Sequence, residues 1–121
     1  MIGIGLDAVE VARFRAVLSR RPSILERLFS ATERNDMAQR ADPVPGLAAR
    51  FAAKEATMKA FGVGLATVHF SEIEVHSEES GAPRLVLSGR AAKLAEQREV
   101  NDLALSLTHS ETIAAAVVLI S

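Results

Sequence analysis

The sequence predicts an α+β fold, with one compact domain that combines a mainly antiparallel sheet with packed helices. Three observations lead to this prediction. The 121 residues suffice for one ordinary domain but not for two. Helical and strand-like segments occur in a mixed order, with the strand candidates in hairpin pairs and the helices grouped, which is not the alternation of a doubly wound sheet. We find no internal repeat, so we expect a single domain over residues 1–121.

The first elements are a strand and a series of helices. Residues 2–6 form a short apolar run with two glycines, which predicts a strand, and Asp7 stands at or just past its end. From residue 9 to about residue 19, apolar side chains recur at helical spacing. The helical pattern continues through residues 24–29.

The middle of the chain contains the strongest predicted helix. Before it, Ser30 to Glu33 has the pattern of a helix N-terminal capping box. Residues 40–46 contain two prolines and a glycine and form the clearest predicted loop. Residues 47–61 are rich in alanine and free of Gly and Pro, and Gly62 follows as a stop, so this segment predicts a helix.

The C-terminal half predicts two hairpins and one helix. Residues 70–76 alternate in the manner of a strand, and a turn leads to a second strand at 84–87. Residues 89–99 form a short amphipathic pattern, followed by strand candidates at 103–108 and 113–119.

The composition excludes several functional classes. The chain has no cysteine, which excludes a disulfide scaffold, a thiol nucleophile and a Cys-ligated metal. The N-terminus has no basic segment ahead of an apolar run, as a signal peptide would. The longest apolar run, residues 113–120, is too short to span a bilayer. We therefore expect a cytoplasmic protein that does not enter a membrane.

The charge distribution indicates an acidic partner of limited size. A net charge of −1 argues against a general nucleic-acid-binding protein. Residues 11–25, however, contain four arginines and no acid, which favours a local basic face. A solvated helix face without a partner is the alternative reading of this pattern alone.

Glu55 occupies an unexpected position in the predicted central helix. At 100° per residue it lies about 40° from Phe51 and about 60° from Met58, within the expected apolar stripe. A buried carboxylate needs a cation, a metal or hydrogen-bond donors beside it. An ordinary ion pair with Lys59, four residues on, is one interpretation. The other is a hard-cation ligand, which requires further oxygen donors from elsewhere.

Asp7 is the natural second donor, because acids at strand ends commonly face a cleft. Two carboxylates suit Mg²⁺, which keeps several waters and often takes further ligands from a substrate phosphate. Zinc is disfavoured because there is no Cys, and His69, His76 and His109 show no paired ligand spacing. A turn-forming or helix-capping role for Asp7 remains the alternative.

Other nucleophile and nucleotide motifs are absent. The S-L-T-H-S segment places His109 at a hairpin corner, where a surface role is the ordinary expectation. No G-x-S-x-G elbow, Walker loop or G-x-G-x-x-G fingerprint occurs in the sequence.

Three motifs together resemble a known family. They are G-I-G-L-D-x-x-E at residues 3–10, R-F-A-A-K-E-A-x-x-K-A-F-G at 50–62 and S-L-T-H-S at 106–110. Their order and spacing, with F-S-E-I-E-V at 70–75 and G-A-P at 81–83, are similar to holo-(acyl-carrier-protein) synthase. This is the small, single-domain type of 4′-phosphopantetheinyl transferase, so the resemblance implies the fold of that enzyme family.

The resemblance implies a reaction and a catalytic set. The phosphopantetheine arm of coenzyme A would pass to a serine of apo-acyl carrier protein in support of fatty acid biosynthesis, with release of adenosine 3′,5′-bisphosphate. Asp7 and Glu55 would bind Mg²⁺, and Lys59 would act on the leaving phosphate. Glu55 or a metal-held water would accept the serine proton.

The resemblance also implies binding residues and an assembly. Arg13 and Arg20 would dock the acidic carrier protein, which favours the functional reading of the basic face. The assembly that the resemblance implies is a homotrimer with active sites shared between adjacent subunits. The positions implied to contact coenzyme A are Arg50, Lys54, Pro83, His109 and Ser110.

Two other functions are compatible with the same residues. One is a Mg²⁺-dependent phosphohydrolase of a nucleotide diphosphate, with water as the nucleophile at the carboxylate pair. The other is a non-catalytic carrier-protein-binding module of the same fold.

Overall fold

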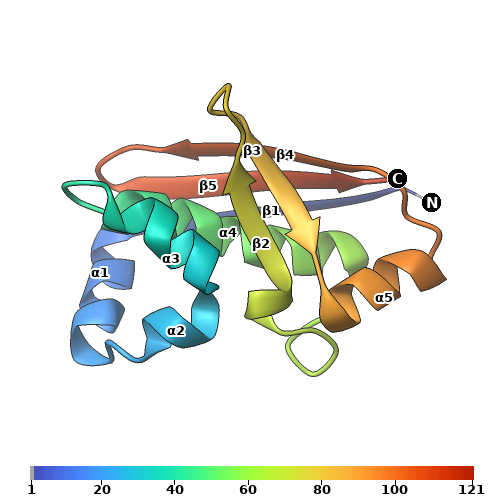
Figure 1. The fold of residues 1–121 in the computed structure, drawn as a ribbon, viewed down its shortest axis with the longest axis horizontal. Coiled ribbons are helices and arrows are strands. Elements are labelled where there is room, and N and C mark those ends of the chain that lie inside the picture. The colour runs from blue at the N-terminus through green and yellow to red at the C-terminus, as the bar shows by residue number, and fades with distance from the viewer. Residues whose placement is uncertain (1) are drawn as a thin grey trace.

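A computed structural model describes residues 2–121, and within them lie two antiparallel sheets and a set of helices (Figure 1). The three-stranded sheet has the order β1-β5-β4, and the second sheet pairs β2 with β3. This arrangement confirms the predicted α+β class. The strands are β1 (Gly3–Glu10), β2 (Ile73–Ser77), β3 (Pro83–Leu87), β4 (Leu103–His109) and β5 (Ile113–Ile120). The helices are α1 (Val11–Arg20), α2 (Ile24–Leu28), α3 (Ala31–Ala38), α4 (Val44–Phe61), the 3₁₀ turn η1 (Phe70–Glu72) and α5 (Gly89–Gln97).

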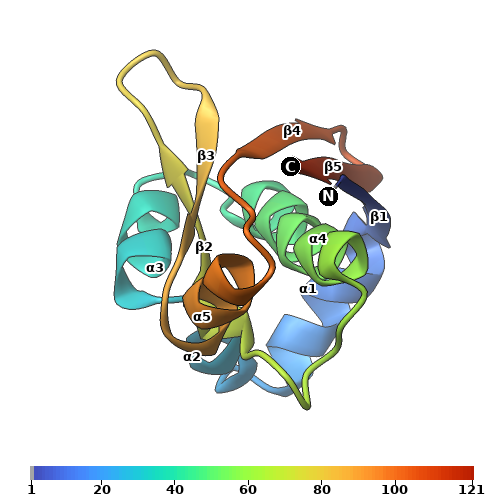
Figure 2. The same cartoon turned by 90° about the vertical axis from the view of Figure 1, so that its right-hand side faces the viewer.

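Helix α4 is the centre of the molecule. Figure 2 shows it between the three-stranded sheet, the β2–β3 hairpin and α1. Its alanine side chains are small, so β1 can approach the helix backbone closely. A Cβ atom at Gly5 would collide with the carbonyl of Ala56, and one at Gly3 would collide with the carbonyl of Ala60. The two glycines of the N-terminal run are therefore required by this close approach of strand to helix.

Several predicted element boundaries are confirmed. Ser30 caps α3, because its side chain accepts a hydrogen bond from the amide of Glu33 while the Glu33 carboxylate accepts one from the amide of Ser30. Gly62 ends α4 in the left-handed conformation, with φ of 69°. Both hairpins form between the predicted strands.

Three local predictions were wrong. Strand β1 continues to Glu10 because β5 pairs with it along its whole length, so Asp7 lies within the strand, opposite Ala116. The predicted loop is shorter, because α4 begins at Val44 and its first turn tolerates Pro45, whose missing amide proton has no helical partner there. Residues 70–72 form a 3₁₀ turn rather than the start of β2.

One face of the three-stranded sheet packs on α4, and the other remains apolar and open. Alternate residues of β5, from Ala114 to Ile120, are buried beneath the sheet. On the opposite face, Ile4 is 65% exposed and Leu119, its partner across the strands, is 45% exposed. No helix within residues 2–121 has both the length and the apolar character needed to cross a membrane.

Candidate active site

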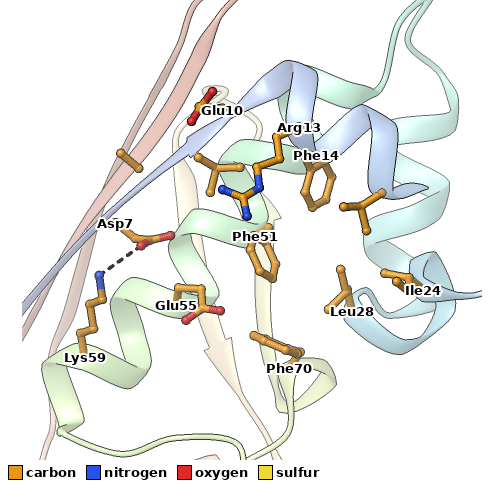
Figure 3. A pocket seen from close by; sticks show the side chains of 13 residues that line it. Asp7, Glu10, Arg13, Phe14, Ile24, Leu28, Phe51, Glu55, Lys59 and Phe70 are labelled. Carbon is orange, nitrogen blue, oxygen red and sulfur yellow. Dashed lines mark hydrogen bonds and ion pairs between the residues drawn. The ribbon is translucent and has the colours of Figure 1, made fainter. Parts of the chain in front are cut away.

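A cleft of about 670 Å³ opens between β1, α1, α2, α4 and η1. Figure 3 shows that charged side chains surround one end, while the other end is apolar. Phe51 packs on Phe14 and on Phe70, with ring centroids 5.4 and 5.5 Å apart. We call Phe14, Phe51 and Phe70 the aromatic wall. The charged residues at the other end are Asp7, Glu10, Arg13, Glu55 and Lys59.

Glu55 reaches the cleft because it lies on the only side of α4 that is not buried between residues 46 and 61. Between Gly46 and Phe61, only Phe51, Glu55 and Lys59 are not buried. These residues are four apart, so they follow one side of the helix. The predicted neighbourhood with Phe51 is confirmed. Met58, in contrast, does not line the cleft but is buried in the core. Helix α4 is enclosed on almost every side, so it has no single apolar stripe.

Asp7 and Glu55 come from different elements and face the same space (Figure 3). Burial raises the pKa of Glu55, and the negative charge of Asp7 raises it further, although Lys59 opposes this effect. The cost of two neighbouring carboxylates would be relieved by a bound cation. This geometry brings together the two residues that the sequence analysis paired.

Lys59 bonds to Asp7 rather than to Glu55. Its ammonium lies 3.1 Å from Asp7 Oδ1 and donates a second hydrogen bond to the carbonyl of Leu6 at 3.0 Å. Within residues 2–121, Glu55 and Lys59 do not form an ion pair with each other. The alternative of an ordinary helical ion pair for Glu55 is therefore excluded in this structure. The Lys59 side chain remains 55% exposed at the charged end.

The donor set of the cleft suits a hard cation with an incomplete protein shell. Within the described part of the chain, no three His, Cys, Asp or Glu side chains gather at one point. Asp7 and Glu55 could therefore supply two carboxylate ligands, with the rest left to substrate and water. That division is typical of Mg²⁺.

Lys54 does not lie where the predicted coenzyme A contact requires it. Its side chain is fully buried, and its ammonium donates hydrogen bonds to Glu33 Oε1 and to the carbonyls of Phe70 and Ile73. All three donors are thus occupied inside the protein. The prediction of a direct contact with coenzyme A was wrong, because the side chain points away from solvent on the far side of α4.

Arg50 and Pro83 form a second group, away from the cleft. Arg50 is 4% exposed and donates a hydrogen bond of 3.1 Å to the hydroxyl of Ser77, which pairs with Pro83 across the hairpin. Its Nε atom is buried without a partner. Burial lowers the pKa of Arg50, and the nearby positive charge of Arg40 lowers it further. At 100° per residue, Arg50 lies about 140° around α4 from Glu55.

His109 and Ser110 form a third group at the corner between β4 and β5. Both are exposed. The Ser110 hydroxyl accepts hydrogen bonds from the amides of Thr112 and Ile113, each at 3.2 Å. The carbonyl of Thr112 accepts a hydrogen bond from the amide of Val11, which joins this corner to the start of α1.

Arg13 and Arg20, two of the four arginines of the basic face, are exposed on α1. Arg13 lines the charged end of the cleft, and Arg20 lines a neighbouring hollow with Arg21 and Ile24. Their spacing of seven residues puts them on one side of the helix. The predicted face therefore borders the cleft.

Sequence reasoning missed the apolar end of the cleft. Phe70 and Leu28 line it, but they are far apart in the chain and belong to short elements without strong periodicity. No local pattern distinguishes such residues from core residues. Arg40, whose charge acts on Arg50, is an exposed residue after α3 and was missed because no motif marks it.

Comparison with known proteins gives a consistent result. Residues 3–118 match the model of the 4′-phosphopantetheinyl transferase superfamily. The chain is 41% identical over 120 residues to a holo-[acyl-carrier-protein] synthase of Moorella thermoacetica, covering 99% of this chain and 94% of that protein.

Two solved structures share the fold. A holo-[acyl-carrier-protein] synthase from Neisseria meningitidis has a TM-score of 0.92 and 31% identity, over 100% of this chain and 99% of its own. A coenzyme A complex of the enzyme from Chronobacterium ammoniagenes has a TM-score of 0.86 and 36% identity, over 99% and 96% of the two chains.

Proposed function

The chain belongs to the 4′-phosphopantetheinyl transferase superfamily, and we propose from this membership how its cleft carries out the transfer. It is an enzyme that moves the phosphopantetheine arm of coenzyme A to a serine of apo-acyl carrier protein. The observation that carries the mechanism is the convergence of Asp7 and Glu55 on one cleft beside the exposed Lys59 (Figure 3).

Asp7 and Glu55 are the proposed ligands of Mg²⁺. Their convergence, together with the raised pKa of Glu55, supports a cation at this place. The bound ion would neutralise charge on the diphosphate of coenzyme A. Lys59 holds Asp7 in position and keeps its ammonium near the charged end, where it stabilises the leaving phosphate. Glu55 or a water molecule accepts the proton of the attacking serine hydroxyl.

The coenzyme A site is proposed to lie between two subunits. In one chain, Arg50 and Pro83 lie on the opposite side of α4 from Asp7 and Glu55, and α4 is enclosed between them. A single ligand therefore reaches both groups only if they come from different copies. The positive charges of Arg50 and of its neighbour Arg40 favour a phosphate group nearby. His109 and Ser110 are proposed to border the same ligand from the β4–β5 corner.

The open face of the three-stranded sheet supports a homotrimer. It exposes Ile4, Leu6, Ile113 and Leu119 by between 43% and 65%. Apolar patches of this kind typically mark an interface. A closed ring of three copies would cover this face on every subunit, and the proposed shared site requires the Arg50 group of one copy to lie beside the cleft of the next.

Cytoplasmic location and a role in fatty acid biosynthesis belong to the same proposal. The absence of cysteine from all 121 residues is compatible with a reducing compartment. An acyl carrier protein is the substrate in the name of the Moorella relative, and a protein that carries acyl groups suits the proposed role in fatty acid biosynthesis.

Reversing the charge on α1 should weaken carrier-protein docking without affecting coenzyme A. We expect Arg13→Glu or Arg20→Glu to raise the KM for the carrier protein about tenfold, because rim charges act mainly on encounter and docking. Steady-state kinetics with each substrate varied in turn gives both KM values. Lys93→Glu, an exposed reversal on α5, is the matched control. A higher KM for coenzyme A alone would contradict the docking role.

Transfer itself is tested by intact mass measurement of the carrier protein. Incubation with coenzyme A and Mg²⁺ should add one phosphopantetheine to the carrier serine and release adenosine 3′,5′-bisphosphate. Release of this nucleotide without any carrier protein would favour a phosphohydrolase instead. Binding of the carrier without a mass gain would favour a non-catalytic module.

A further inference from the structure

The buried ion pair between Glu33 and Lys54 has no part in the chemistry described above. Both side chains are 0% exposed, and their charged atoms lie 2.7 Å apart. Glu33 Oε1 also accepts a hydrogen bond from the amide of Ser30, and Oε2 accepts one from the amide of Val75 at 3.0 Å. The pair thereby joins α3, α4 and β2 at one point.

The remaining two bonds of Lys54 go to the ends of η1. Its ammonium donates to the carbonyl of Phe70, the first residue of the 3₁₀ turn, at 3.0 Å and to the carbonyl of Ile73, which directly follows the turn. A compact ammonium with three donors can hold three oxygens around one point, which an apolar side chain of the same length cannot do. Lys54 therefore fixes the position of η1 relative to α4.

The consequence of this arrangement lies on the cleft side. The ring of Phe70, whose carbonyl Lys54 holds, packs on Phe51 with centroids 5.5 Å apart and lines the cleft. Phe51 is one helical turn before Glu55. The distance between η1 and α4 thus determines where Phe70 lies against Phe51, and so the position of the aromatic wall beside Asp7 and Glu55 (Figure 3).

Stability alone is a poor reason for such a pair. A buried ion pair loses the hydration of both ions, and well-packed apolar residues in its place are often as stable or more so. Directional hydrogen bonds to two backbone carbonyls, by contrast, determine a single geometry. This favours a role in shape over a role in stability.

The geometry points to Lys54, held by Glu33, as a positioning residue that acts through Phe70 on the binding of coenzyme A. This inference rests on the proposed function and specifies what the wall does. The uncharged part of the pantetheine arm is the section of coenzyme A that suits an aromatic surface next to the site of phosphate transfer. Lys54 acts on it without contact.

The test uses the paired variant Glu33→Gln/Lys54→Met, which removes both charges together and leaves no lone buried ion. It leaves the carbonyls of Phe70 and Ile73 without their donor, so η1 should shift. We expect the KM and Kd of coenzyme A to rise about tenfold while kcat is largely kept, since Asp7, Glu55 and Lys59 are unchanged. Lys93→Met, on the exposed side of α5, is the matched control and should leave both constants unchanged.

Phe70→Ala decides whether the effect passes through the wall. It should raise the KM for coenzyme A by itself, and adding it to the paired variant should raise the KM no further than the larger of the two effects. Full additivity would overturn the route through Phe70. A lower kcat with an unchanged KM would mean only a smaller folded fraction, and that result would overturn the inference as well.

Lys54→Arg carries the same comparison if the paired variant does not fold. A guanidinium keeps the charge opposite Glu33 but cannot place one nitrogen among the three acceptors. We expect a near-normal melting temperature and a higher KM for coenzyme A. A wild-type chain that binds coenzyme A but does not transfer would contradict the proposed function alone, and the Kd values would still decide this inference.

Discussion

Glu55→Gln should lower the rate of phosphopantetheine transfer by about 10²–10³-fold, the loss typical of removing one preorganised electrostatic group from a transfer site. The amide keeps the shape of the side chain but removes its charge, so the proposed Mg²⁺ site would lose one of its two protein ligands. Asp7→Asn should have a similar effect and should also release Lys59, which is bonded to Asp7 Oδ1. Intact mass measurement of the carrier protein over time gives the rates.

Glu55→Gln should leave the fold intact or make it more stable. Burial and the charge of Asp7 both raise the pKa of Glu55, which means that the ionised carboxylate is disfavoured in the folded protein. Gln at this position removes that repulsion, so the melting temperature should not fall. Loss of activity with retained stability is the signature of a functional carboxylate.

A matched control separates charge at the site from charge in general. Glu79→Gln changes an exposed acid at the tip of the β2–β3 hairpin and should leave the transfer rate unchanged. Near-normal turnover in either Glu55→Gln or Asp7→Asn would rule out these residues as the metal ligands. A transfer rate that depends more steeply on the Mg²⁺ concentration in the two variants than in the wild type would support the assignment.

Ile4→Glu should separate the proposed trimer and abolish most of the activity. Ile4 is 65% exposed on the open face of the sheet, and a carboxylate there would be buried unpaired in any assembly that covers this face. The isolated chain should still fold, because the side chain points away from α4. Light scattering and circular dichroism distinguish a folded monomer from an unfolded chain. Leu65→Glu, an equally drastic change at a residue 53% exposed in the loop after α4, should leave the assembly unchanged.

Mixed assemblies test the shared site directly. Glu55→Gln and Arg50→Ala should each be weakly active alone, since each removes one side of every site. If the site lies between subunits, an equal mixture regains about a quarter of wild-type activity, because that fraction of interfaces pairs an intact Glu55 with an intact Arg50. No recovery after subunit exchange, or full activity in a monomer, would contradict a shared site.

Local sequence signals identified most of the elements. The Ser30 to Glu33 pattern predicted its capping box, and Gly62 predicted the end of α4, because both features depend on neighbouring residues. The limits of β1 were wrong because pairing with β5, more than 100 residues away in the chain, extends the strand past Asp7. The start of α4 was wrong because Pro is acceptable in the first turn of a helix.

The candidate site residues divide in the same way. Asp7, Glu55 and Lys59 were selected from the sequence, because acids at unusual positions and a family motif are visible there. Lys54 has the same type of signal as its neighbour Glu55, yet the structure buries it against Glu33 and η1. One residue of rotation on a helix, about 100°, separates a cleft from the interior.

The sequence by itself determined the α+β class, the element types and the carboxylate pair, since these follow from periodicity, glycine and proline positions and a recognisable motif. Only the tertiary structure showed that Lys59 forms its ion pair with Asp7 rather than with Glu55, and that Lys54 is buried in an ion pair with Glu33. It also separated Arg50 from the cleft by the width of α4. Side-chain direction on a helix enclosed on almost every side depends on what packs around it, and those neighbours come from distant parts of the chain.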